Sequence, residues 1–144
     1  MILDAQNLFS DAQALTAAAA STNLIDLGHA YSRLGSGRTL YVHLNVDVAL
    51  TDSGSDSTIA VTIEQDTTAA FSSATAVQTL FTVTALSAIG DVYKAVIAPG
   101  VITEQFIRLY YTMANGNLST GSVTAAIVID LQDEATLPDN ITIS

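Results

Sequence analysis

The sequence contains no cysteine and no tryptophan, and only four of its 144 residues are basic. Without cysteine the chain can form no disulfide, no cysteine-ligated zinc site and no thiol nucleophile. The four basic residues stand against fourteen acidic ones, which gives a formal net charge of −10. Nucleic-acid binding and basic membrane anchors both require clustered positive charge, so we expect neither kind of partner.

Long apolar runs are also missing, since none approaches the ~18 residues that a membrane helix requires. The N-terminal segment MILDAQNLFSDAQ carries acidic residues and no basic ones, so we expect no secretion signal there. What the chain does have is Ala, Val, Ile and Leu, within a hydrophobic content of 49%, together with many Thr and Ser residues. This composition and length favour a single β-rich domain spanning residues 1–144.

The clearest pattern lies in residues 38–50, RTLYVHLNVDVAL. Every second residue from Leu40 to Leu50 is aliphatic, and polar or small residues fill most of the positions between. Successive side chains of a strand point to opposite faces, so this alternation predicts a half-buried strand with one wholly aliphatic face.

Similar alternation recurs along the chain and is separated by frequent turn signals. Residues 58–66 follow the turn-forming segment 51–57, and we interpret these two strands and their loop as an antiparallel hairpin. The remaining predicted strands cover residues 22–27, 77–83, 92–98, 105–113 and 123–131. About eight short strands without a long helix predict an all-β, antiparallel jelly-roll sandwich.

The two ends of the chain are less regular. Residues 1–21 are interpreted as an extended N-terminal arm or an edge strand. A short helix over residues 14–20, with Ser10 as a possible cap, is an alternative. Residues 133–144 form an acidic C-terminal tail, which we expect to be solvated.

Few side chains suggest chemistry. His29 and His43 are the only histidines, and a metal site would need further ligands at suitable spacing. Residues 52–57, DSGSDS, faintly resemble a calcium loop but lack the acidic spacing and distal Glu of an EF-hand. No nucleophile-elbow, phosphate-loop or dinucleotide motif is present. We therefore expect no catalytic residues, no metal site and no cofactor, and we predict that the protein is not an enzyme.

The five tyrosines could line a sugar-binding platform, although core or interface packing is their more common use. They are Tyr31, Tyr41, Tyr93, Tyr110 and Tyr111.

Three segments carry a resemblance to a known family. They are MILDAQNLFSDAQALT at the N-terminus, STNLIDLG at residues 21–28 and TLYVHLNVDVAL at residues 39–50. With these segments the chain resembles the capsid cement (decoration) proteins of tailed double-stranded DNA bacteriophages. The resemblance covers most of the chain and is most specific in its first thirty residues.

The resemblance implies a jelly-roll subunit, made in the host cytoplasm, that assembles on the outer capsid surface of the virion. There it would bridge neighbouring major capsid protein subunits and strengthen the DNA-filled head. It also implies a homo-oligomer, either a homodimer or a homotrimer. The alternative function is a jelly-roll carbohydrate-binding or host-adhesion module of a phage particle.

The N-terminal segment supplies the candidate assembly contacts. It is apolar without clean periodicity, so it could gain order by lying along the sheet edge of a neighbouring subunit or the capsid. The competing interpretation is an edge strand of the domain's own sandwich. The candidate contacts are Met1, Ile2, Leu3, Leu8 and Phe9.

Overall fold

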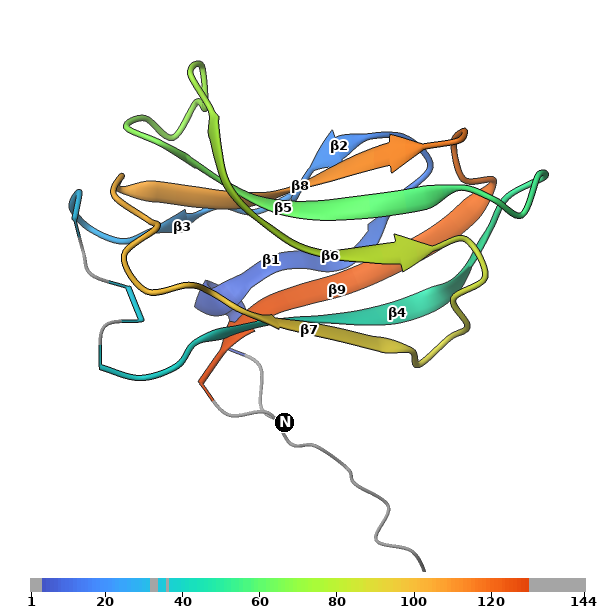
Figure 1. Cartoon of the computed structure of the whole chain (residues 1–144), viewed down its shortest axis with the longest axis horizontal. Coiled ribbons are helices and arrows are strands. Elements are labelled where there is room, and N and C mark those ends of the chain that lie inside the picture. Colours follow the sequence, from blue (N-terminus) through green and yellow to red (C-terminus); the bar gives the residue numbers. More distant parts are fainter. Residues whose placement is uncertain (1–3, 32–33, 36, 130–144) are drawn as a thin grey trace, which may run out of the picture.

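The computed structural model describes residues 4–31, 34–35 and 37–129, and these form an antiparallel β-sandwich (Figure 1). A short 3-10 helix, η1 (Ala5–Asn7), precedes the first strand. The strands are β1 (Leu8–Ala14), β2 (Ala19–Ala20), β3 (Ile25–Asp26), β4 (Tyr41–Thr51), β5 (Thr58–Asp66), β6 (Thr75–Thr84), β7 (Val92–Val96), β8 (Phe106–Ala114) and β9 (Thr120–Val128). Among the described residues, no helix is long and apolar enough to span a membrane.

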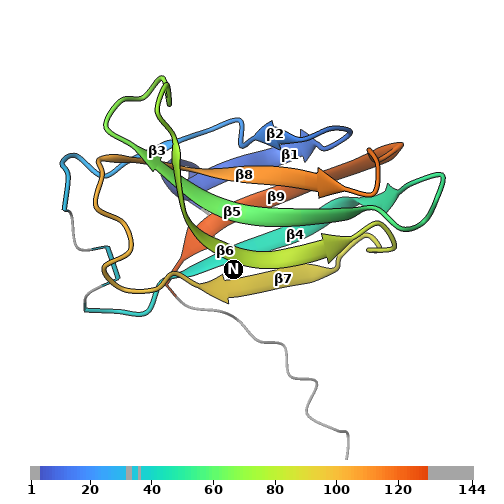
Figure 2. The same cartoon turned by 45° about the horizontal axis from the view of Figure 1, so that its top comes forward.

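The strands form two sheets that face each other across one core (Figure 2). The first sheet has the order β1-β9-β4-β7, and the second has the order β2-β8-β5-β6, with β3 also pairing with β8. Every connection crosses from one sheet to the other, except β2–β3 and the β5–β6 hairpin. With β2 and β3 sharing one place beside β8, this is the eight-position order of a jelly roll, and the predicted fold is confirmed.

The core is aliphatic, and the alternating segments supply it. Val42, Leu44 and Val46 of β4 point inward from the first sheet, and Ile59, Val61 and Ile63 of β5 point inward from the second. On β8, whose sequence is apolar on both faces, the inward side chains are Ile107, Leu109 and Tyr111. The largest fully buried side chains are Tyr111, Phe9, Leu15, Leu44, Leu50, Ile59, Ile63, Ile97, Ile107, Leu109, Val42 and Val46.

The predicted hairpin between residues 38–50 and 58–66 is wrong. β4 pairs with β7 and β9, whereas β5 pairs with β6 and β8, so the two strands lie in different sheets. The Asp52 carboxylate accepts hydrogen bonds from the backbone and hydroxyl of Ser57, and the loop turns the chain over the end of the sandwich. Alternation shows which face of a strand is buried. Because both sheets bury an aliphatic face, alternation does not show which sheet a strand belongs to.

The aliphatic face of β4 is also interrupted. Its pairing with β9 shifts register between Val46 and Val48, and Val48 is 51% exposed although Val46 and Leu50 are buried. A bulge adds a residue to one strand and re-aims its neighbours, which a strict two-residue alternation cannot anticipate. Val48 therefore lies on the surface.

The N-terminal region forms part of the domain. β1 is the edge strand of the first sheet, and Ala19 and Ala20 pair with Tyr111 and Tyr110 of β8. The alternative helix over residues 14–20 does not form. Its small side chains offer little apolar surface for docking a helix, whereas an extended chain can satisfy its backbone against β8. The predicted acidic tail, residues 133–144, lies outside the described residues.

Candidate assembly surfaces

Neither the two histidines nor the segment 52–57 gathers further metal ligands among the described residues. His43 lies on the outer face of β4, paired across the sheet with Lys94, and His29 lies in an exposed loop. Partial burial, and then the charge of Lys94, lower the pKa of His43. Asp52 is occupied in capping its own loop through Ser57. In the part of the chain that the structure describes, no group of three His, Asp or Glu residues is placed to hold a metal ion.

The tyrosines do not form a sugar-binding platform. Tyr111 is fully buried, and the Tyr93 hydroxyl lies 2.6 Å from Ser87 Oγ while its ring stacks on Phe81. Tyr41 lies on the first sheet and Tyr110 on the second. Tyr31 is 72% exposed in the connection between β3 and β4. The tyrosines therefore do not gather on one face of the sandwich, and the arrangement does not favour the carbohydrate-binding alternative.

The candidate contacts in the N-terminal segment divide into three groups. The side chain of Phe9 is completely buried in the domain's own core and has no surface left for a partner. Leu8 is half-buried on β1, opposite Ala126 of β9. Met1, Ile2 and Leu3 lie outside the described residues.

The outer face of the second sheet has few charges. Thr58, Ala60 and Thr62 of β5 point outward, because the residues between them are buried. Their paired neighbours on β6 and β8 are also small or hydroxylated, and we call this surface the threonine face. Its other members are Thr79, Thr82, Thr84, Tyr110, Thr112 and Ala114.

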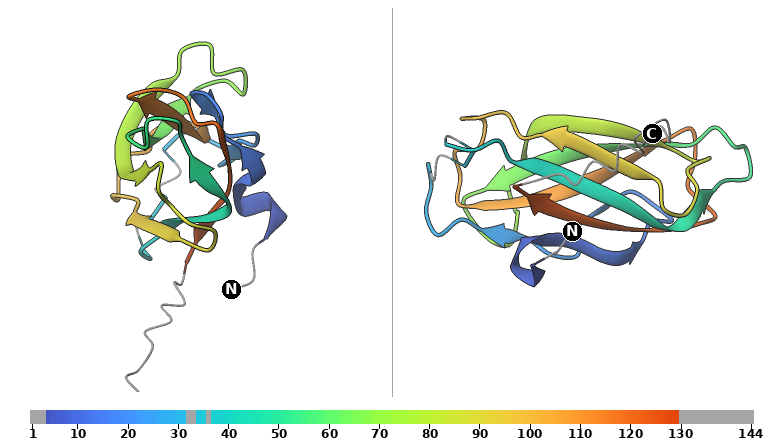
Figure 3. Two further views of the ribbon diagram at one scale, coloured as in Figure 1. Left: turned by 90° about the vertical axis from the view of Figure 1, so that its right-hand side faces the viewer. Right: turned by 90° about the horizontal axis from the view of Figure 1, so that it is seen from below.

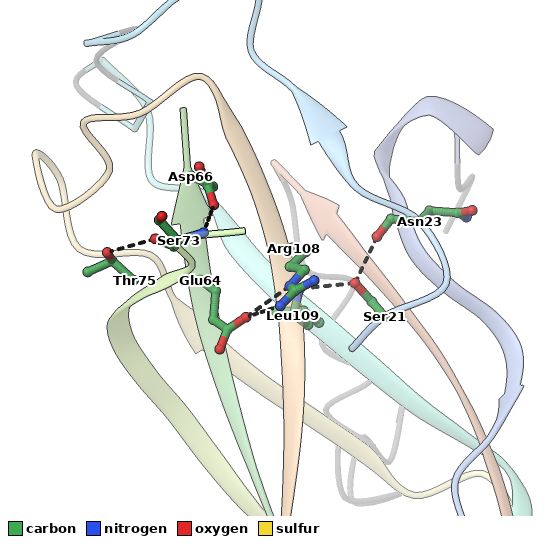
Figure 4. A network of polar contacts seen from close by, with 8 residues as sticks. All are labelled: Ser21, Asn23, Glu64, Asp66, Ser73, Thr75, Arg108 and Leu109. Atoms are coloured by element: carbon green, nitrogen blue, oxygen red, sulfur yellow. Dashed lines mark hydrogen bonds and ion pairs between the residues drawn. The ribbon is translucent and has the colours of Figure 1, made fainter. Parts of the chain in front are cut away.

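Charge appears on this sheet where Arg108 pairs with Glu64 (Figure 4). The Arg108 Nη2 atom lies 2.8 Å from Glu64 Oε2, and its guanidinium lies 4.3 Å from the centre of the Phe71 ring. Beside it, the Asp66 carboxylate accepts a 2.8 Å hydrogen bond from the backbone N–H of Ser73. These contacts fix the β5–β6 loop and leave the two charges paired with each other.

Two glutamines close the sides of the sandwich. Gln78 of β6 donates to the Val96 carbonyl and accepts from the Ala98 N–H, which ties the second sheet to the end of β7. On the other side, Gln13 of β1 donates to the Ala20 carbonyl and accepts from the Thr22 N–H. Because each side-chain amide replaces missing strand pairing, both pairs of edge strands are held together.

Four connections meet at one end of the sandwich, which faces the viewer in the left view of Figure 3. They are residues 15–18, 52–57, 85–91 and 115–119, and we call this region the four-loop end. Backbone hydrogen bonds join it, from Ala85 to Ser57 and from Leu15 to Gly121. The right view of Figure 3 shows the first sheet, whose strands lead into this end.

An apolar patch lies at the four-loop end, where the β6–β7 loop runs beside β4. The Leu50 N–H donates to the Ser87 carbonyl, and the Gly90 N–H donates to the Val46 carbonyl, so the loop extends the edge of the first sheet. The members of the patch are Val48, Leu86, Ile89 and Val92, which are 51%, 73%, 71% and 51% exposed. Clustered exposure of large apolar side chains marks interaction surfaces.

Sequence reasoning missed this patch. Leu86 and Ile89 lie in a segment without alternation, and Val48 had been assigned to the core face. The signal that could have found it is the segment ALSAIG at residues 85–90, which has two large apolar residues in a loop.

Comparison with known proteins gives one family. The model of the family Bbp16 matches residues 9–127, which run from the second residue of β1 to the penultimate residue of β9. No curated protein matches the chain.

Proposed function

The chain belongs to the Bbp16 family of bacteriophage proteins, and from that premise we propose that it is a structural virion protein that cements the capsid. In this role it binds the outer surface of the head as a homo-oligomer and holds neighbouring major capsid protein subunits together. It has no catalytic role and requires no cofactor.

The observation that carries the proposal is the exposed apolar patch on the β-sandwich of a protein from a phage family. Specific protein interfaces have apolar centres from which charged residues are depleted. Val48, Leu86, Ile89 and Val92 supply such a centre on the surface of an otherwise acidic chain. A cement protein needs surfaces of this kind because it works by binding.

Rigidity also supports the proposal. A protein that braces a shell must resist distortion between its contact points. The buried core, the long β4–β9 and β5–β8 pairings, and the closures by Gln13 and Gln78 make the domain suitable for carrying load.

Self-association is the second part of the proposal. Copies of a chain with a net charge of −10 repel one another unless they meet through neutral surfaces. The threonine face is such a surface, because its residues are uncharged and, apart from Tyr110, small. Its nearest charges, Glu64 and Arg108, form a pair. The N-terminal residues Met1, Ile2, Leu3 and Leu8 are proposed to add assembly contacts.

The test is to add the purified protein to phage heads that were assembled without it. We expect saturable binding in hundreds of copies per head, which is the scale that capsid cementing requires, and an increase in the temperature at which heads release DNA. A stoichiometry of a few copies per virion, together with specific hits on a glycan array, would instead establish the host-adhesion alternative.

A further inference from the structure

We propose that the four-loop end is the docking surface, and that its partner presents an apolar contact surrounded by Lys or Arg side chains. This inference rests on the proposed function and adds to it an orientation and a partner chemistry. The sandwich would stand on its four-loop end, with the apolar patch against the shell.

The patch is pre-organised for docking. Ser87, between the patch residues Leu86 and Ile89, donates its hydroxyl to the Thr84 carbonyl. Ser87 Oγ also lies 2.6 Å from the Tyr93 hydroxyl oxygen. Asp91 accepts a 2.7 Å hydrogen bond from the Ala88 N–H, which closes the turn that presents Ile89. Because these hydrogen bonds already hold the loop in one conformation, docking requires little further ordering of the loop. The entropic cost of binding is correspondingly small.

The charges around the patch favour a basic partner. Asp52, Asp56 and Asp91 lie in the loops of this end, and Asp47 lies beside Val48 on β4. The four loops, all of which the structure describes, contain no Lys or Arg. The nearest basic side chain in sequence is Lys94 on β7.

The same charges argue against a second copy as the occupant. Two four-loop ends brought together would oppose their carboxylates with no cation from either set of loops, and like charges across an interface are unfavourable. Lys or Arg residues around the partner's contact would pair with these carboxylates. The charge pattern therefore assigns this surface to a different, basic protein surface.

The experiment measures binding of full-length variants to heads purified from a phage strain that lacks this protein. The test variant is Leu86→Ser combined with Ile89→Ser, and the matched control is Leu24→Ser. All three side chains are exposed, so folding should be preserved, and circular dichroism checks this. We expect at least tenfold weaker binding for the double variant and less than a twofold change for the control, since few interface residues carry most of the affinity.

A second arm tests the charge of the partner. The variant that combines Asp56→Asn with Asp91→Asn should bind heads more weakly than the wild type does. Its affinity should also depend less on NaCl concentration, because the lost ion pairs are the contacts that salt screens. Equal salt dependence for this variant and the wild type would overturn the basic-partner assignment.

The outcomes separate the inference from the function it rests on. If the wild type binds heads and the Leu86/Ile89 variant binds equally well, the docking surface is wrong but the cement function stands. If the wild type does not bind heads at all, the cement function itself fails. If the variant still binds heads but changes its oligomeric state in light scattering, the occupant is a second copy and the assignment is overturned.

Discussion

The hydroxyl oxygens of Ser10 and Tyr111 lie 2.7 Å apart inside the sandwich, 101 residues apart in the chain. Ser10 on β1 gives its own proton to Gln13 Oε1, so the Tyr111 hydroxyl on β8 is the donor of this bond. Gln13 in turn donates to the Ala20 carbonyl. This chain of polar contacts joins the edge strand of the first sheet to the centre of the second.

Removing either partner should have unequal effects. Ser10→Ala leaves the buried Tyr111 hydroxyl without its acceptor and should cost about 1–3 kcal/mol of unfolding free energy. Tyr111→Phe removes the donor but leaves Ser10 bonded to Gln13, so its cost should be only about 0.5–1.5 kcal/mol. Urea denaturation measures both values, and a larger cost for Tyr111→Phe would contradict the assigned direction of the bond.

The same tyrosine predicts how stability responds to alkaline pH. Burial raises the pKa of Tyr111 to about 12, because the interior disfavours the charged phenolate. A tyrosine in the unfolded chain titrates near pH 10, so the unfolded state loses this proton first. Stability from this group is therefore complete below about pH 10 and is lost as pH rises toward 12, by up to about 2–3 kcal/mol. Denaturation from pH 8 to pH 12 should show a smaller decline for Tyr111→Phe than for the wild type.

Much of the architecture was predictable because burial imposes a two-residue period. The inward-facing aliphatic residues of β4 and β5, apart from Val48, follow from the sequence alone. The sequence of β8 is apolar on both faces and does not indicate which face is buried. The pairing of the strands could not be predicted, because the aliphatic faces of β4 and β5 are equally compatible with one sheet and with two facing sheets. The exposure of Val48 depends on a bulge, and the apolar patch depends on hydrogen bonds such as Leu50 to Ser87 that no local pattern encodes.

The Asp66 carboxylate predicts a response to acid. Hydrogen bonds, first that from the Ser73 N–H and then those from Thr68 and Thr67, outweigh desolvation and lower its pKa. A lowered folded-state pKa contributes stability above the unfolded value of about 4, and that contribution is lost as pH falls below it. The protection of the Ser73 amide against exchange, relative to an unstructured amide at the same pH, should therefore fall in acid. In Asp66→Asn this protection should already be low at neutral pH, and normal protection there would contradict the carboxylate's role.

Gly121 in β9 should tolerate no side chain. Its φ is +151°, and an added Cβ would collide with Cδ2 of Leu50, whose side chain is buried in the core. Gly121→Ala should therefore cost about 1–3 kcal/mol through overpacking. Gly37→Ala is the matched control, because a Cβ there meets nothing within 4 Å. Equal midpoints for the two variants in thermal unfolding would argue against the tight contact.

Two truncations separate the folding role of the N-terminal segment from its proposed assembly role. Removing residues 1–9 takes away Phe9, whose burial is complete, and losing such a side chain costs about 3–5 kcal/mol. That is a large part of the about 5–15 kcal/mol that stabilises a typical domain, so this truncation should be unfolded or nearly so. Removing residues 1–7 leaves β1 and its pairing with β9 in place, so this variant should fold.

The shorter truncation then tests assembly. If Met1, Ile2 and Leu3 contact a neighbouring subunit or the capsid, the folded variant should bind heads more weakly or lose its oligomeric state in light scattering. Leu8→Ser in the full-length chain examines the half-buried residue that the truncation retains. Normal binding and oligomerisation by both variants would remove the N-terminal segment from the assembly surface and leave its contribution confined to the core through Phe9.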